Sequence, residues 1–166
     1  MNIVLIGMSG AGKSTLGVLL GKALGMGYID TDIIIQQAEG RLLQDIIDND
    51  GTEKFLNIEE KVICQLNLTN TVIATGGSAV YSEKAMQCLR QDGQVIYLHV
   101  PFEEIEKRLK NITTRGIVIK KGSSLRDVYE ERVPLYKKYA DMTVDISNCD
   151  IEQSVNQIIN VYKGKA

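Results

Sequence analysis

A glycine-rich segment at residues 7–14, Gly-Met-Ser-Gly-Ala-Gly-Lys-Ser, constrains the fold of this chain more than any other feature. It matches the phosphate-loop pattern GxxxxGK[ST]. An apolar run at residues 2–6 precedes the segment, and residues 13–24 follow it with their leucines on one face of a predicted helix. The pattern is meaningful only between a strand and a helix. The sequence therefore predicts a phosphate site built from a strand, a loop and a helix.

Each part of this segment has a predicted role at a bound nucleotide. The glycines let backbone N–H groups converge on the β and γ phosphates, and the start of the helix adds its positive dipole end. Lys13 carries a charge to the bridge between these phosphates, and the Ser14 hydroxyl is placed to ligate Mg²⁺. The expected cofactors are thus ATP and Mg²⁺. The residues expected to bind them are Gly7, Ser9, Gly10, Ala11, Gly12, Lys13, Ser14 and Thr15.

Short apolar runs alternate with helical patterns along the rest of the chain. Strands are expected at residues 2–6, 27–30, 71–74, 94–98 and 142–145, and helices at 13–24, 51–68, 82–90, 103–110, 124–139 and 152–161. This order predicts an α/β fold in which helices cover both faces of a five-stranded parallel sheet. The length of 166 residues fits a single domain, 1–166. Ligands of such sheets bind beyond the carboxyl ends of the strands.

The composition argues against nucleic-acid partners, a membrane span and secretion. The formal net charge is −2, without the basic surplus of a nucleic-acid binder, and no apolar run approaches the ~18 residues of a membrane span. The N-terminus does not resemble a secretory signal. Cys64, Cys88 and Cys149 are odd in number and form no CxxC pair, so reduced thiols are expected instead of a disulfide or structural zinc. We expect a cytoplasmic monomer that acts on a small molecule.

A pair of carboxylates, Asp30 and Asp32, follows the second predicted strand and faces the same rim as the phosphate loop. If the segment stays extended, the two side chains point opposite ways and have different roles. One can hold water around Mg²⁺, while the other accepts a proton from a substrate hydroxyl. The alternative is a turn in which an aspartate caps a helix. A DxxG at residues 48–51 has no NKxD segment to accompany it, so a small-molecule kinase is favoured over a GTPase.

Four motifs in the same order as in the shikimate kinase family make the chain similar to that family over nearly its whole length. They are the phosphate loop, the Asp30/Asp32 pair, the turn Thr75-Gly76-Gly77-Ser78, and Glu-Arg-Val-Pro-Leu-Tyr at 131–136 with Ala-Asp at 140–141. The resemblance implies a single-domain P-loop kinase with a mobile lid. It implies ATP-dependent conversion of shikimate to shikimate 3-phosphate, a step toward the aromatic amino acids.

The resemblance also implies individual roles. Asp30 would organise Mg²⁺, and Asp32 would bind two substrate hydroxyls and act as the base. Gly76 and Gly77, followed by Ser78, would offer backbone N–H groups to the substrate. Arg132 would grip its carboxylate.

Two segments have roles by the same resemblance. Residues 32–62 would form a helical substrate-binding segment, in which Glu59 braces the carboxylate-binding arginines. Residues 112–124 would form the lid, whose Arg115 approaches the ATP phosphates and acts in catalysis. Lid closure would exclude water from the reaction.

The chain departs from the family pattern at the expected carboxylate site. The family's FRxxE reads Phe55-Leu56-Asn57-Ile58-Glu59, so Leu56 replaces an arginine. Loss of a charge-assisted bond should weaken carboxylate binding at least about tenfold. Ser78 likewise replaces the third glycine of the turn, and the lid lacks its proline.

Three interpretations stay open at this point. The chain is a divergent shikimate kinase, in which Arg41 or Lys54 reaches the carboxylate instead. Alternatively, it is a paralogue that phosphorylates a different small hydroxyl compound, less acidic or carrying an amine. The third is a nucleotide-binding regulatory protein without kinase activity, against which the intact Lys13 and Asp32 count.

Overall fold

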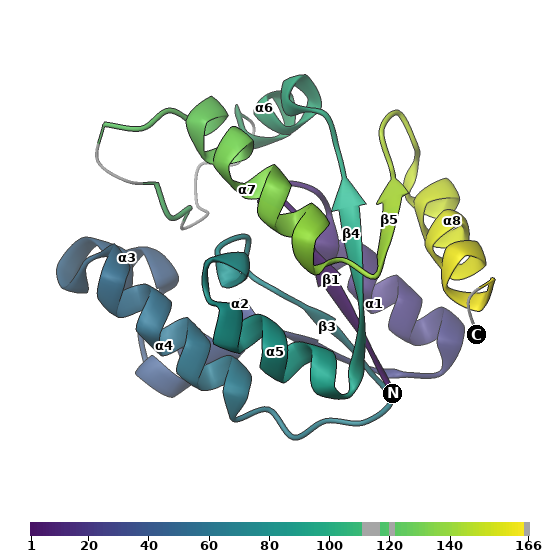
Figure 1. Ribbon diagram of the computed structural model, residues 1–166, viewed down its shortest axis with the longest axis horizontal. Coiled ribbons are helices and arrows are strands. Elements are labelled where there is room, and N and C mark those ends of the chain that lie inside the picture. The colour runs from purple at the N-terminus through teal and green to yellow at the C-terminus, as the bar shows by residue number, and fades with distance from the viewer. Residues whose placement is uncertain (111–116, 120–121, 165–166) are drawn as a thin grey trace.

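The computed structural model describes residues 1–110, 117–119 and 122–164. Within them, five strands form one sheet: β1 (Asn2–Ile6), β2 (Gly27–Asp30), β3 (Thr71–Ala74), β4 (Gly93–His99) and β5 (Met142–Asp145). All neighbouring strands pair in parallel, in the order β2-β3-β1-β4-β5 (Figure 1). The strand that leads into the phosphate loop therefore lies at the centre of the sheet.

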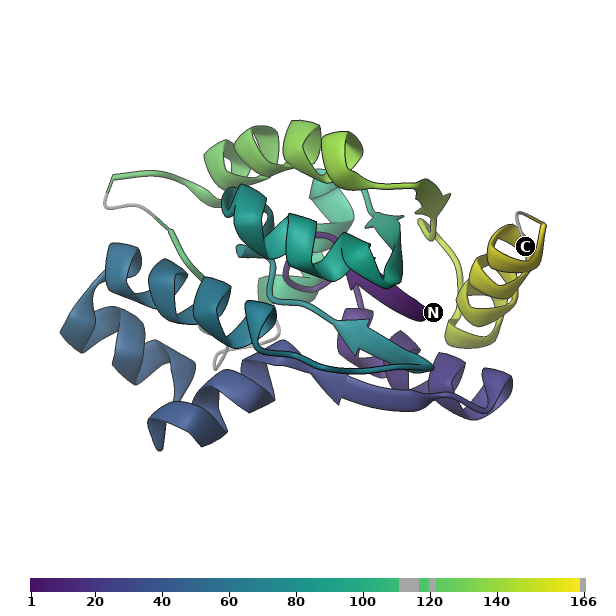
Figure 2. The same ribbon diagram turned by 60° about the horizontal axis from the view of Figure 1, so that its bottom comes forward.

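Helices cover both faces of this sheet. They are α1 (Lys13–Leu24), α5 (Glu83–Gln91), α6 (Phe102–Lys110), α7 (Leu125–Tyr139) and α8 (Ile151–Lys163). Figure 2 shows α5 and α7 over one face, with α1 against the other. The predicted α/β architecture is confirmed. No helix in the described part of the chain is both long and apolar enough to cross a bilayer.

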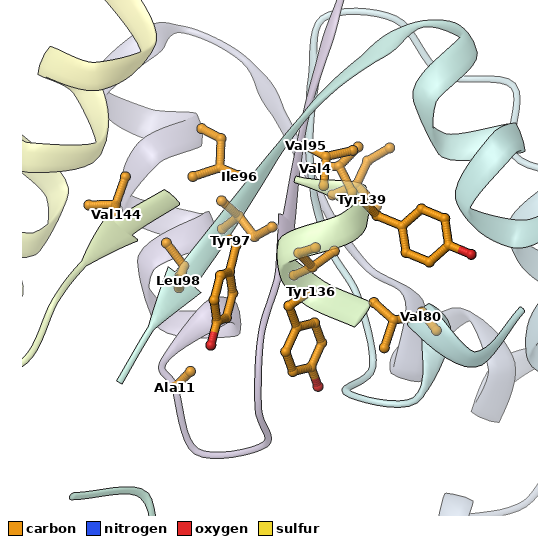
Figure 3. Packing of buried hydrophobic residues seen from close by; sticks show 14 of the residues in the cluster. Val4, Ala11, Val80, Val95, Ile96, Tyr97, Leu98, Tyr136, Tyr139 and Val144 are labelled. Atoms are coloured by element: carbon orange, nitrogen blue, oxygen red, sulfur yellow. The ribbon is translucent and has the colours of Figure 1, made fainter. Parts of the chain in front are cut away.

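The core explains why the central strand β1 appears in the sequence as a continuous apolar run. Every residue of β1 is buried, since helices lie on both sides of the sheet. The Tyr97 ring on β4 stacks on the Tyr136 ring of α7, with centroids 5.1 Å apart (Figure 3). The Tyr136 hydroxyl donates to the carbonyl of Gly77 at 2.7 Å. The main core is thereby tied directly to the turn that follows β3.

Three helices project beyond the β2–β3 end of the sheet: α2 (Thr31–Glu39), α3 (Leu43–Asp50) and α4 (Thr52–Cys64). Gly40 ends α2 with φ of 64°. Neither α2 nor α3 was among the helices predicted one by one, although the resemblance implied a helical segment over residues 32–62, and α4 ends at Cys64, short of the predicted residue 68. A second apolar cluster holds these helices together and consists of Ile35, Leu43, Ile46, Phe55, Val62 and Val118.

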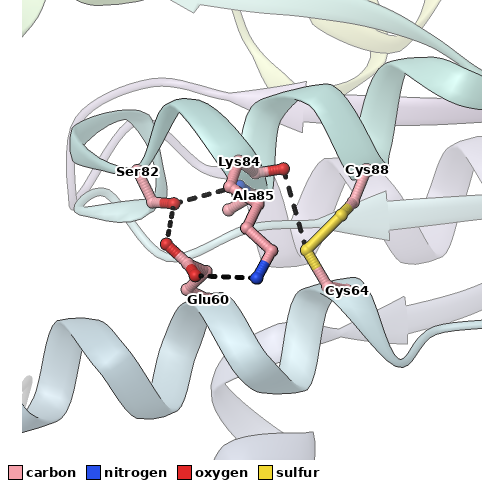
Figure 4. The surroundings of a disulfide bond; sticks show 6 residues. All are labelled: Glu60, Cys64, Ser82, Lys84, Ala85 and Cys88. Carbon is pink, nitrogen blue, oxygen red and sulfur yellow. Dashed lines mark hydrogen bonds and ion pairs between the residues drawn. A yellow bond between two sulfur atoms is a disulfide. The ribbon is translucent and has the colours of Figure 1, made fainter.

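The expectation of three reduced thiols is wrong. Cys64, at the end of α4, forms a disulfide with Cys88 of α5, and only Cys149 is free among the described residues (Figure 4). The two cysteines are 24 positions apart in the chain, but packing of α4 against α5 brings their Cα atoms within 5.3 Å. Cysteine spacing alone does not reveal such a contact.

Candidate active site

The phosphate loop connects β1 to α1 with a backbone that needs glycine. Gly7, Gly10 and Gly12 have φ of 147°, 85° and 94°. A Cβ on Gly7 would also stand 2.8 Å from the carbonyl oxygen of Leu98. Residues other than glycine rarely adopt such φ values, so the shape of the loop depends on glycine at these three positions.

Lys13 lies back across this loop. Its Nζ donates to the carbonyl oxygens of Gly7 at 2.7 Å and Met8 at 2.9 Å, and the residue is 7% exposed. Gly12 caps α1 without a side-chain hydrogen bond. The first N–H groups of α1 therefore have no capping side chain, which is the arrangement that binds anions at helix N-termini.

The other predicted loop residues lie at two different places. Ser9 borders the main cavity and faces Gly77, where its Oγ lies 3.1 Å from the position of a Cβ. Ala11 is fully buried, and Thr15 borders a second hollow on the far side of the loop.

The main cavity has a volume of about 260 Å³ and opens beyond the carboxyl ends of the strands. It brings together several residues predicted from three separate motifs. Its lining is Ser9, Lys13, Ser14, Asp30, Asp32, Ile33, Gln36, Leu42, Leu43, Gln44, Thr75 and Gly77. The phosphate loop and the predicted acceptor residues thus share one space.

Ser14 and Asp30 form a pair of oxygen ligands at the cavity. The Ser14 hydroxyl donates to Oδ2 of Asp30 at 2.6 Å, and the Asp30 carboxylate is largely buried. Burial and this carboxylate raise the pKa of Tyr28, whose hydroxyl lies 3.4 Å from Oδ2, to about 12. Hydroxyl and carboxylate oxygens suit Mg²⁺, which proteins commonly bind through one or two carboxylates plus substrate phosphates. No cluster of three or more His, Cys, Asp or Glu among the described residues offers a rival metal site.

The carboxylate pair Asp30 and Asp32 does not lie in the extended segment that the sequence had suggested. Instead, α2 begins at Thr31 with Asp30 as its N-cap, and Oδ1 of Asp30 accepts from the N–H of Asp32 at 3.0 Å. Asp32 therefore lies in the first turn of α2. The two carboxylates still face different groups: Asp30 faces Ser14, while Oδ1 of Asp32 lies beside Gly76.

The turn after β3 passes between several charged side chains. A Cβ on Gly76 would stand 2.6 Å from Oε1 of Glu59 and 2.7 Å from Oδ1 of Asp32. On Gly77, a Cβ would stand 2.8 Å from Nη1 of Arg132. Only glycines fit between these groups. The N–H of Gly76 donates to Oγ1 of Thr31 at 3.1 Å.

Glu59 has a different environment from the one expected. Its Oε2 accepts from the Ser78 hydroxyl at 2.7 Å, whereas its Oε1 has no hydrogen-bond partner among the described residues. Burial raises the pKa of this carboxyl to about 7, and the negative charge of Asp32 adds to the effect. The predicted bracing of Arg132 by Glu59 is not found among the ion pairs of the described residues.

Arg132 is 1% exposed and is held by neutral groups. Its Nη2 donates to the carbonyl of Val118 at 2.8 Å, and its Nε donates to the Tyr81 hydroxyl at 3.2 Å. The guanidinium also lies over the Tyr81 ring, 5.1 Å from its centroid. Arg132 is therefore fixed in place before any ligand binds.

Arg41 and Lys54, the other basic residues considered for the substrate carboxylate, form ion pairs with a different residue. Both pair with Oδ2 of Asp50, at 2.6 and 3.0 Å. Leu56 instead borders a small cavity of about 120 Å³ between α4 and α7, together with Tyr81 and Val118. The interpretation that Arg41 or Lys54 replaces the family's arginine is not supported by these contacts.

Part of the predicted lid lies outside the described residues, and Arg115 is among the residues not described. Within the predicted lid, the described residue Val118 is buried in the second apolar cluster with α2–α4. The carbonyl of Val118 is also the acceptor for Arg132.

Arg108 is a site residue that the sequence analysis did not find. It donates to the carbonyl of Gly10 at 3.2 Å and pairs with Glu104 one turn earlier on α6. With Thr15 and the segment between β5 and α8, it borders the hollow on the outer side of the phosphate loop. A basic residue in the last turn of the helix after β4 was the available signal, but such residues also occur for helix-dipole reasons alone.

The comparisons with known proteins agree with this geometry. The family model described as shikimate kinase matches residues 9–163. The shikimate kinase of Thermodesulfovibrio yellowstonii is 34% identical over 98% of this chain and 95% of its own length. That of Thiobacillus denitrificans is 38% identical over 99% of this chain and 89% of its own.

Solved structures of the same kind superpose over the whole chain. Shikimate kinase from Acinetobacter baumannii in complex with shikimate matches with a TM-score of 0.91 and 29% identity, over 99% of this chain and 93% of that one. Shikimate kinase from Aquifex aeolicus matches with a TM-score of 0.81 and 30% identity, over 99% and 98%. The chain therefore belongs to the shikimate kinase family.

Proposed function

We propose that the chain transfers the γ-phosphoryl group of ATP to a ring hydroxyl of shikimate, forming shikimate 3-phosphate on the route to aromatic amino acids. The single observation that carries this proposal is the shared cavity, in which Lys13, Ser14 and Asp30 lie opposite Asp32 and Gly77. A phosphate donor and a hydroxyl acceptor can meet there. The likeness to a kinase bound to shikimate supports the choice of acceptor.

The nucleotide is proposed to bind along the phosphate loop. Backbone N–H groups of residues 7–14 hold the β and γ phosphates, and Lys13 neutralises charge at their bridge. Thr15 and Arg108 border the hollow where the rest of the nucleotide lies. Ser14 and Asp30 hold Mg²⁺, which when bound neutralises charge on the phosphate oxygens.

The acceptor is proposed to bind between α2 and the turn after β3. Asp32 takes the proton of the attacking hydroxyl of the acceptor. The oxygen of that hydroxyl forms a bond to the γ phosphorus, while the bond between the γ phosphorus and the ADP oxygen breaks. Gly77 and Ser78 line the ring, and Arg132 meets its carboxyl end. Arg115 is proposed to approach the phosphates from the lid.

We further propose a cytoplasmic monomer without nucleic-acid or membrane partners. The net charge of −2 lacks the basic surplus of a nucleic-acid binder, and the cavity suits a small-molecule ligand. The Cys64–Cys88 disulfide argues in the other direction, because reducing compartments keep thiols reduced. Counting free thiols in protein quenched directly from cells tests this point: one free thiol is the count that the structure gives, and three would mean that Cys64 and Cys88 are reduced in the cell.

The test is ADP release over a panel of hydroxyl acceptors, with Asp32→Asn as the diagnostic variant. Shikimate should be turned over in preference to polyols of similar size, and ADP release without acceptor should be small. Because the amide keeps the shape of Asp32 but removes its basicity, the variant should lose turnover by about a hundredfold or more and keep its ATP affinity. Equal losses in ATP and acceptor binding would instead place Asp32 in the metal site.

A further inference from the structure

The Cys64–Cys88 disulfide joins two elements that both reach the acceptor side of the cavity. Cys64 is the last residue of α4, which contributes Phe55 and Val62 to the second apolar cluster. Cys88 lies on α5, and the turn after β3 leads into α5 through the short 3₁₀ helix η1 (Ala79–Tyr81). The disulfide therefore connects the helix under the acceptor side to the segment that continues from the acceptor turn.

Three side-chain contacts hold α4 against this segment. Nearest the cavity, Oε2 of Glu59 accepts from the Ser78 hydroxyl at 2.7 Å, and Ser78 directly follows the cavity residue Gly77. At the next position of α4, Glu60 accepts from the Ser82 hydroxyl at 2.6 Å, and the disulfide joins the far ends of the two helices (Figure 4). Opening the disulfide would leave only the two hydrogen bonds to hold this contact.

The disulfide lies where a thiol can reach it. Both cysteines are half-buried, and both border a hollow of about 70 Å³. Asn67, Gln91 and Asp92 border the same hollow and are exposed, so it lies at the surface of the protein. Disulfides that are exposed are the ones that exchange readily with thiols, whereas structural disulfides resist reduction.

The location proposed for this chain gives the bond a meaning. In mesophiles, the disulfides of cytosolic proteins are usually transient and serve either catalysis or redox sensing. Neither Cys64 nor Cys88 is among the residues that line the main cavity, so neither is placed to take part in phosphoryl transfer. Redox sensing is the role that remains for an accessible disulfide in a cytoplasmic kinase.

We propose that the Cys64–Cys88 pair is a redox-responsive site that sets the affinity of the kinase for its acceptor. With the bond closed, α4 and the turn after β3 are held in the arrangement that binds the acceptor. With the bond open, this arrangement must be ordered when the acceptor binds, which costs affinity. The phosphate loop is built on β1 and α1 and has no such link, so ATP affinity should not change. The inference rests on the proposed function only for the identity of the acceptor.

The reductant in this exchange is a dithiol. Its thiolate attacks one sulfur of the pair, a mixed disulfide forms, and the other cysteine leaves as a thiolate that takes up a proton. The second thiol of the reductant then attacks the mixed disulfide and releases the remaining cysteine. Two electrons and two protons pass to Cys64 and Cys88, and the reductant becomes a disulfide. Oxidation of the two thiols by a disulfide reverses these steps.

The direct test compares the oxidised protein with protein reduced by dithiothreitol without denaturant. Alkylation should count one free thiol before reduction and three after it. Coupling between distinct sites typically changes an affinity at least about fivefold, so we expect reduction to raise the KM for shikimate by about that factor or more. The KM for ATP should stay the same. A bond that opens only in denaturant, an unchanged KM for shikimate, or an equal rise in both KM values would each overturn the inference.

Cys64→Ser and Cys88→Ser are the matched controls, because neither can form the bond. Both should show the shikimate KM of the reduced wild type, with and without dithiothreitol. A KM that still rises with dithiothreitol in both variants would assign the effect to the reductant and overturn the inference. The comparison on the wild type needs neither variant to fold.

Hydrogen exchange without ligands provides a readout that does not depend on turnover. Opening the bond should speed exchange in the last turns of α4 and in the turn after β3, while the phosphate loop and α1 keep their rates. Equal exchange in the two redox forms would overturn the inference. If neither form phosphorylates shikimate, the proposed function fails, and hydrogen exchange still decides whether the bond controls the acceptor side.

Discussion

At the scale of single residues, Lys13 has two duties at the phosphate loop. Its ammonium group holds the carbonyls of Gly7 and Met8, and it is the proposed counter-charge for the transferred phosphoryl group. Preorganised positive charge at developing negative charge contributes several kcal/mol to catalysis. We expect Lys13→Ala to reduce kcat by about a hundredfold or more while circular dichroism shows a native fold. A folded variant with near wild-type turnover would contradict the proposed role.

Glu59 makes stability depend on pH in a definite direction. Its folded pKa of about 7 lies above its usual value of 4.5, so the folded state binds the proton more tightly than the unfolded state. The contribution of this group is therefore fully present below about pH 4.5 and is lost as the pH rises through 7.

The loss amounts to about 3 kcal/mol, at 1.36 kcal/mol for each unit of pKa. Urea unfolding of the wild type and Glu59→Gln between pH 4.5 and 8 measures it as the change in the difference between the two proteins. A constant difference over this range would show that the Glu59 carboxyl titrates normally in the folded protein.

At the scale of elements, the disulfide joins the end of α4, the helix that carries Glu59, to α5. A cross-link between positions 24 apart stabilises a protein by about 3 kcal/mol, largely through the unfolded chain. We expect Cys88→Ser to lower the free energy of unfolding by about this amount in the absence of reductant. In excess dithiothreitol the two proteins should be nearly equal. Equal stability under both conditions would mean that the bond does not form in solution.

The central strands β1 and β3 could be predicted from the sequence because every residue in them is buried, whereas β5 alternates between buried and exposed residues. Residues 2–6, 27–30, 71–74 and 142–145 were predicted with the bounds that the structure gives them. The helices that bind the acceptor were harder. Helix α3 ends in Asp48, Asn49 and Asp50, which are typical of a turn, and only its packing into the second apolar cluster makes the segment helical.

The site residues that belong to recognisable sequence motifs could be predicted from the sequence. Lys13, Ser14, Asp30, Asp32 and Gly77 all line one cavity, as expected for residues at the carboxyl ends of parallel strands. The hydrogen bonds within the site were not predictable, because they join residues far apart in the chain. The Ser78 hydroxyl donates to Glu59, 19 positions earlier in the chain. Arg132, the arginine expected to bind the substrate carboxylate, donates to the carbonyl of Val118.

At the scale of the whole molecule, the sheet positions the phosphate loop and the projecting helices position the acceptor side of the cavity. The main core around β1 holds the phosphate loop, whereas the second cluster under α2–α4 holds the acceptor side, and the two share the cavity. Tyr136 and the turn after β3 connect them. ATP and the acceptor must therefore bind at the same time, each on its own part of the fold.

The most direct test of this account follows the γ-phosphoryl group itself. Wild type and Lys13→Ala are incubated with γ-labelled ATP, Mg²⁺ and shikimate, and the products are separated by chromatography. We predict that the wild type moves the label to shikimate, with little free phosphate, and that Lys13→Ala moves almost none. Label that appears only as inorganic phosphate, or that stays on ATP with the wild-type protein, would contradict the claim that this chain is an ATP-dependent shikimate kinase.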